Sequence, residues 1–191
     1  MTEARTLRPQ DRTGTRARLW TVFAAAVLLA SCASPTAQSV NGAANPHDLD
    51  FITNAYQIIL FDRQEGQLAQ TEAKDPEVRA LAAQLLDEAN RFAAELAPAA
   101  AELGIKPPTD LRYNLRVRLT HMRLQHGLGF DEGYIDDQIA SHEETLSAQE
   151  AMPNSGASPS IVGLAMRGTD LVRANLQKLK AVQRRMMMQG S

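Results

Sequence analysis

Several residue types that build common kinds of site are scarce in this chain. Its 191 residues include one cysteine, so no disulfide can form within it. Aromatic residues make up 5% of the sequence, and no stretch alternates apolar and polar residues as a half-buried strand does. There is no glycine-rich phosphate loop, and no serine, histidine and aspartate arrangement nominates a nucleophile. We therefore expect few or no strands, and we predict no catalytic residue.

The first 31 residues have the pattern of an export signal. Five arginines precede a twelve-residue apolar run, Leu19–Ala30, which is too short to span a bilayer as a helix. The run ends in the residues Leu-Ala-Ser-Cys, which resemble the lipobox of bacterial lipoproteins. We therefore predict a signal peptide over residues 1–31, cleavage after Ser31 and lipidation of Cys32, with palmitate among the acyl chains. The alternative is an ordinary signal peptide with a cysteine nearby by accident.

Removal of the signal peptide changes the charge of the chain. Residues 1–31 hold five arginines and two acids, so the mature chain carries 15 basic and 20 acidic residues, a net charge of −5. Such a domain has no general attraction for nucleic acid. Lipidation would make the membrane a partner and would consume the only thiol. Ala33 after the cysteine, in place of Asp, resembles the sorting signal for an outer membrane, so we expect the domain to face the periplasm there.

The mature chain is predicted to consist of a flexible tether followed by helices. Residues 32–44 are small and polar after the lipidated cysteine, and such a segment has a typical reach of about 20 Å. Asn45-Pro46 and Asp75-Pro76 each place a capping residue before a proline, which is typical of a helix start. Apolar spacing predicts that the first helix runs from Asn45-Pro46 to about Lys74 and that the second runs from Asp75-Pro76 to Gly104. Pro98 should bend or split the second helix near residues 94–96.

The second half of the mature chain has three further helical patterns. A short one ends at Gly127 and Gly129, one runs from near Asp131 to before Pro153, and the last opens at Ser158-Pro159. Four main helices with one longer crossover predict an all-α fold, a ferritin-like antiparallel four-helix bundle with a short extra crossover helix. We assign residues 45–188 to this domain and 189–191 to a tail; the oligomeric state is not predicted.

Each main helix carries one polar residue on its apolar stripe. These residues are Asp62, Glu88, His142 and Asn175. If the helices align, the four meet in the core and should pair, because an unpartnered buried polar group costs about 1–3 kcal/mol. We interpret them as a structural polar network and predict no cofactor. The alternative is a transition metal held by His142, Asp62 and Glu88, which is a poor ligand set for such an ion.

Three segments of the mature chain resemble the DUF4142 family. They are DFITNAYQ…EGQLA (50–69), DPEVRALAAQLLDE (75–88) and GFDEGYIDDQIASHEE (129–144). The resemblance covers about residues 50–182 and implies an exported or outer-membrane protein with a ferritin-like bundle and no settled activity. The family often has an acid–His pair on its second helix and a His on its last, where this chain has Glu88-Ala89 and Asn175. His142 is kept, and Asp62 replaces a usual Glu. Losing two histidines argues against a family metal site.

The crossover segment is basic. Arg112, Arg116 and Arg123 share one face of its short helix, opposite leucines. This face could contact anionic lipid headgroups or lipopolysaccharide phosphates. The alternative is a solvated face that balances nearby acids.

Two functions therefore compete. One is a membrane-anchored envelope lipoprotein whose helical bundle is a non-catalytic module for a protein or glycan partner. The other is a ferritin-like metal-binding or redox protein centred on His142. We favour the first, because no second histidine lies near His142.

We predict that Cys32→Ser abolishes incorporation of labelled palmitate and releases the protein from membranes. The physical reason is that the acyl chains supply the attachment, since each buried CH₂ contributes about 0.8 kcal/mol. Ser34→Ala, a change in the tether, should leave labelling intact. Absence of label from the unsubstituted protein would contradict the assignment of Cys32.

Overall fold

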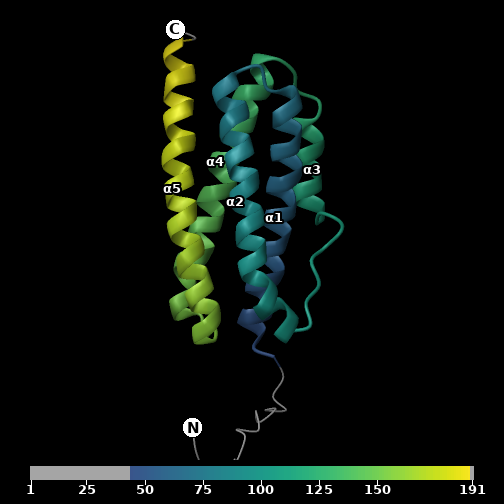
Figure 1. The fold of residues 1–191 in the computed structure, drawn as a ribbon, viewed down its shortest axis with the longest axis vertical. Helices are drawn as coiled ribbons and strands as arrows, with labels where there is room; N and C mark the ends of the chain where they lie inside the picture. The colour runs from purple at the N-terminus through teal and green to yellow at the C-terminus, as the bar shows by residue number, and fades with distance from the viewer. Residues whose placement is uncertain (1–43, 190–191) are drawn as a thin grey trace, which may run out of the picture. The chain divides into compact units, whose positions relative to one another are not determined.

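The computed structural model describes residues 44–189, and this part of the chain is all-α (Figure 1). Its helices are α1 (Pro46–Glu72), α2 (Pro76–Glu102), α3 (Tyr113–Met122), α4 (Leu128–Ala151), a short 3-10 helix η1 (Met152–Asn154) and α5 (Pro159–Gln189). No strand occurs among the described residues. The predicted all-α class is confirmed.

The four long helices form two antiparallel hairpins that pack side by side. α1 packs on α2 and α4 on α5, while α2 contacts α5 and α1 contacts α4 across the bundle. The segment between α2 and α3 runs back along the bundle, so that α3 lies against α1 (Figure 1). One long crossover between two helical hairpins is the connectivity of a ferritin-like bundle.

The predicted helix starts at Asn45 and Asp75 are confirmed. The Asn45 side chain accepts a hydrogen bond from the His47 backbone N–H at 3.0 Å. The Asp75 carboxylate accepts one from the Glu77 N–H at 2.7 Å. A proline follows each cap as the first helical residue, where its missing N–H costs nothing.

Two buried aspartates tie the interhelical turns to distant helices. Asp131, at the start of α4, is fully buried and accepts hydrogen bonds from the backbone N–H groups of Lys74 and Asp75, each at 2.9 Å. Asp48, in the first turn of α1, accepts one from the Ser158 N–H at 2.8 Å. Each carboxylate therefore fixes the turn that joins two other helices.

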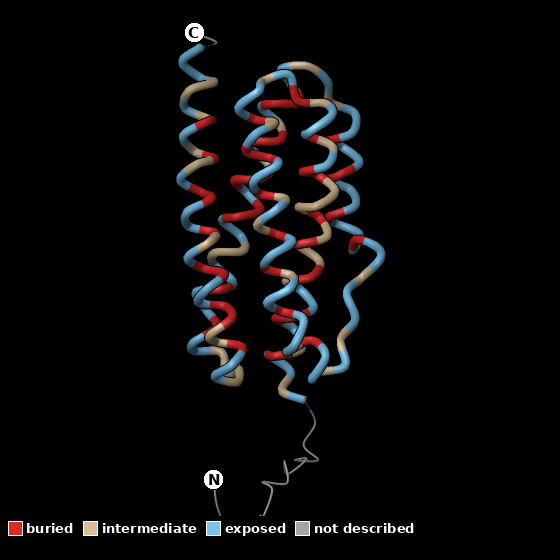
Figure 2. The backbone as a smooth tube through the Cα atoms, viewed as in Figure 1, coloured by how far each residue is buried: buried red, intermediate tan, exposed pale blue. Residues whose placement is uncertain are grey.

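The buried residues, most of them apolar, lie on the inward faces of the helices (Figure 2). Phe130, Tyr134 and Leu179 belong to the cluster in one half of the bundle, and Phe51, Phe92 and Leu96 to that in the other. A third cluster joins Phe61 of α1 to Leu115 and Leu119 of α3. The crossover helix is therefore part of the core.

Two predicted boundaries differ from the structure. Of the predicted bend or split near residues 94–96, the split does not occur, since α2 continues through Pro98 to Glu102. Pro98 and Ala94 are both exposed, so water can bind the carbonyl group that the proline leaves without a donor. α4 begins at Leu128, three residues before Asp131, because Gly127 takes a positive φ of 66° and turns the chain there. Gly129 therefore lies inside α4.

The predicted signal peptide, Cys32 and nearly all of the tether lie in residues 1–43, outside the described residues. Within residues 44–189, no helix is long and apolar enough to cross a membrane.

We predict that Asp131→Ala lowers the free energy of unfolding by about 1–3 kcal/mol, because it removes the fully buried carboxylate that accepts hydrogen bonds from the backbone N–H groups of Lys74 and Asp75. Urea denaturation measures this change. Glu132→Ala removes the neighbouring acid, which is exposed, and should have little effect. Equal losses in the two variants would contradict the proposed role of Asp131.

Candidate functional site

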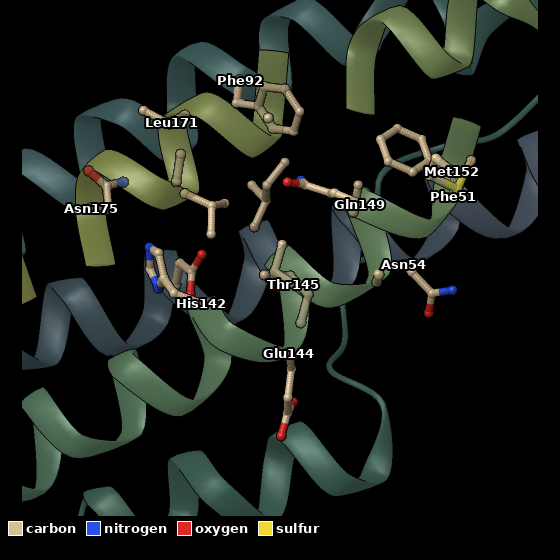
Figure 3. Close-up of a pocket in the computed structure, with 18 of the residues that line it drawn as sticks. Phe51, Asn54, Phe92, His142, Glu144, Thr145, Gln149, Met152, Leu171 and Asn175 are labelled. Atoms are coloured by element: carbon tan, nitrogen blue, oxygen red, sulfur yellow. The ribbon is translucent and has the colours of Figure 1, made fainter. Parts of the chain in front are cut away.

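A pocket of about 420 Å³ lies in the bundle, with α1, α2, α4 and α5 all contributing to its wall (Figure 3). We call it the α1–α4 pocket. Its apolar lining includes Phe51, Ile59, Leu85, Phe92 and Leu171. The space is left unfilled because several residues of the wall are small. They are Ala55, Ala89, Ala148 and Gly168.

The pocket opens between α1 and α4. Its exposed polar lining residues come from α1, from α4 and from the segment before α3; they are His47, Asp50, Asn54, Arg112 and Glu144. The lining residues of α2 and α5 are buried or half-buried. Arg112 donates a hydrogen bond from its guanidinium group to Asn54 Oδ1 at 2.6 Å, across the mouth.

The four polar residues predicted from the apolar stripes all line this pocket. They are Asp62 of α1, Glu88 of α2, His142 of α4 and Asn175 of α5. Lys178 Nζ lies 3.3 Å from both Glu88 Oε1 and Asn175 Oδ1, which links α2 to α5. Asp62 Oδ1 is 3.5 Å from Gln138 Nε2. The structure thus brings the four to one pocket, but their hydrogen bonds run to Gln84, Lys178 and Gln138 instead of to one another.

His142 is held by its own helix. Its Nδ1 lies 2.9 Å from the Gln138 carbonyl oxygen, and a carbonyl oxygen only accepts, so Nδ1 carries a proton. The positive charge of His142 and the hydrogen bond from Gln138 lower the pKa of Asp62, but burial has the larger effect and raises that pKa above its ordinary value. Asp62 and His142 therefore interact electrostatically at one end of the pocket.

A second group of acids lies next to this end, between α1 and α4. Glu65 is fully buried and accepts a hydrogen bond from Gln138 Nε2 at 2.9 Å. Burial raises the pKa of Glu65 well above its usual value, and the charge of Asp137 and a hydrogen bond between the two carboxyl groups raise it further. Glu65 Oε1 and Asp137 Oδ2 are buried and have no donor among the described residues, so a proton on one of the two carboxyl groups would satisfy both oxygens. We call Glu65, Asp137 and Gln138 the carboxyl cluster.

Arg118 of α3 forms an ion pair with Asp137 of the carboxyl cluster. Its Nε lies 2.9 Å from Asp137 Oδ1, and its guanidinium group stacks 4.8 Å from the centre of the Phe61 ring. Of the arginines predicted to face an anionic surface, Arg116 lies over Tyr113, and Arg123 is exposed at the end of α3. Contact of Arg112, Arg116 and Arg123 with an anionic surface stays a prediction.

The sequence analysis missed the polar stripe of α4. Gln138, His142, Thr145 and Gln149 recur at helical spacing, and the last three line the pocket. Glu65, three residues after Asp62, gives the matching signal on α1. A test of all polar residues at helical spacing would have found both sets.

The ligand set proposed as the metal alternative is not assembled here. In residues 44–189, no group of three or more His, Cys, Asp or Glu side chains is placed to hold a metal ion. Glu88 pairs with Lys178, and Asp62 faces Gln138.

Three buried polar atoms of the pocket wall have no hydrogen-bond partner among the described residues. They are Glu88 Oε2, Thr145 Oγ1 and Gln149 Oε1. The Gln149 side chain reaches toward Phe92 across the pocket (Figure 3). A Cβ atom at Gly168 would lie 2.6 Å from Gln149 Nε2 and 2.9 Å from the Phe92 ring, so a side chain there would displace both.

Comparison with known proteins agrees with the helical fold and identifies one family. The family model described as "Domain of unknown function (DUF4142)" matches residues 33–182, which confirms the resemblance seen in the sequence. A crystal structure of a DUF305 fragment from Deinococcus radiodurans superposes with a TM-score of 0.66 at 13% identity, covering 75% of this chain and 99% of that chain. At this identity the likeness establishes the fold alone. No curated protein matches the chain.

We predict that Glu65→Gln stabilises the protein increasingly as the pH rises from about 5 to about 8. The raised pKa of Glu65 means that the unfolded chain releases this proton at lower pH than the folded chain, so its contribution to stability is greatest in acid and is lost as pH rises. Glutamine keeps one donor and one acceptor in place and does not titrate.

Urea denaturation across this pH range measures the difference between the variant and the unsubstituted protein. Glu72→Gln, a half-exposed position on the same helix, controls for the loss of one acid. A difference between Glu65→Gln and the unsubstituted protein that does not change with pH would contradict the raised pKa.

Proposed function

The chain belongs to the DUF4142 family, and we propose that it is a lipid-anchored envelope protein whose bundle is a non-catalytic module that binds a small molecule in the α1–α4 pocket. The signal peptide, the lipobox and Cys32 support the anchor. Ala33 supports an outer-membrane location with the bundle facing the periplasm.

The observation that carries the binding proposal is the pocket itself. Ligand pockets are typically concavities of about 300–1,000 Å³, largely apolar, with a few polar groups that orient the ligand. The α1–α4 pocket, at about 420 Å³, has this size and composition. Phe51, Phe92 and Leu171 supply apolar contact area, and each of the four long helices contributes a polar side chain to the wall.

The contacts of the titratable groups favour binding over catalysis. Glu88 is paired with Lys178, and His142 uses Nδ1 on the Gln138 carbonyl. A general base needs an acceptor aimed at the proton that it removes. Glu88 Oε1 and His142 Nδ1 are held by the bundle, and Glu88 Oε2 remains as an acceptor for a bound ligand.

We predict that the protein binds the neutral fluorescent probe N-phenyl-1-naphthylamine at one saturable site and that Ala55→Phe weakens this binding about tenfold or more, a change of about 1.4 kcal/mol. Ala55 is half-buried in the pocket wall, so the added ring occupies the space that the probe needs. Fluorescence titration measures the dissociation constant.

Ala83→Phe adds the same ring at an exposed position of α2 and should leave binding unchanged. Cooperative thermal unfolding of each variant shows that it is folded. Saturable binding that is equal in both variants would place the probe elsewhere, and no saturable binding by the unsubstituted protein would contradict a ligand pocket.

A further inference from the structure

We infer that the α1–α4 pocket takes an amphiphilic organic amine, with its ammonium group beside Glu88 and Asp62 and its apolar body along Phe92 and Leu171. This inference rests on the proposed function, that the pocket binds a small molecule. It adds the chemical class of the ligand.

The first argument is that the pocket wall has acceptors without donors. Glu88 Oε2 and Gln149 Oε1 are buried, line the pocket and have no hydrogen-bond partner among the described residues. Gln149 is 6% exposed, and its amide reaches toward Phe92 across the pocket (Figure 3). A buried acceptor without a donor is costly, so the wall favours a ligand that brings N–H groups.

The second argument is charge. Four carboxyl-bearing residues line the pocket, against a single arginine or lysine, Arg112; they are Asp50, Asp62, Glu88 and Glu144. Arg112 is hydrogen-bonded to Asn54 at the mouth, and Lys178 reaches only Oε1 of Glu88. Glu144 has Arg118 at 3.6 Å. Among the described residues, Asp50 has no cationic side chain in hydrogen-bond contact, and Asp62 has the charge of His142 nearby without a hydrogen bond to it. The lining carboxyl groups still outnumber the lining cations, so the field favours a cation over an anion.

The third argument is the order of the lining groups along the bundle. His142 and Asn175 mark the polar end of the pocket, Phe92 and Leu171 follow, and Phe51 and Met152 lie at the far end (Figure 3). His142 and Met152 are ten residues apart on adjoining helical segments, a span of about 15 Å at 1.5 Å per residue. The pocket is therefore elongated, with the buried side chains of His142 and Asn175 at one end, and suits an ammonium group on a linear apolar chain.

The test compares three probes of equal chain length: octylamine, octanol and octanoate. Isothermal titration calorimetry uses the full-length chain carrying Cys32→Ser, which avoids detergent. We expect octylamine to bind about tenfold or more tightly than octanol, and octanoate to bind most weakly. We also expect Glu88→Gln to weaken octylamine binding about tenfold and to leave octanol binding unchanged.

Asp87→Asn is the matched control, since it removes one acid from an exposed neighbouring position of α2 and should leave all three affinities unchanged. If Glu88→Gln does not unfold cooperatively, Asp62→Asn replaces it, with the same expectation for octylamine. If octanol or octanoate bound as tightly as octylamine, the amine assignment would be overturned, but the proposal that the pocket binds a small molecule would be retained. Failure of all three, while N-phenyl-1-naphthylamine still binds, would also overturn it. Failure of every probe would overturn the proposed function as well.

Discussion

A buried carboxyl group between α1 and α4 determines how three of the helices meet. Glu65 has no access to water, so its oxygens need partners from neighbouring helices. Gln138 and Asp137 of α4 provide them, and Arg118 of α3 neutralises Asp137. The crossover helix therefore lies where its arginine reaches α4, and in that position Leu115 and Leu119 also pack against Phe61 of α1.

The same network separates a tight half of the bundle from an open half. At the carboxyl cluster, α1 and α4 are joined through Gln138, which donates to Glu65 and lies 3.5 Å from Asp62. Toward the start of α1, small side chains face one another from several helices, and the pocket lies there; Ala55, Ala89 and Gly168 are examples. The polar groups at the inner end of the pocket are thus positioned by residues that never touch its contents.

Much of the fold could be predicted from sequence because its signals are local. A capping residue and a proline set the start of α1 and α2, and Ser158-Pro159 sets that of α5. The places of Asp62, Glu88, His142 and Asn175 on the apolar stripes also predicted that these residues lie together, and all four line one pocket. Glu65 and Asp137 were missed, because their pairing depends on where the crossover helix docks. The pocket was missed because its volume depends on which small residues face each other across four helices.

Asn45 and Asp48 give the bundle a mechanical property. Asn45 donates a hydrogen bond to the Gly156 carbonyl at 2.8 Å, and Asp48 accepts one from Ser158 at the same distance. A tensile force on the chain ahead of Asn45 would act along α1 and, through these two bonds, on the turn between α4 and α5. Both hairpins would then share the force from its point of entry, and α1 could separate from the turn only after these two hydrogen bonds had broken.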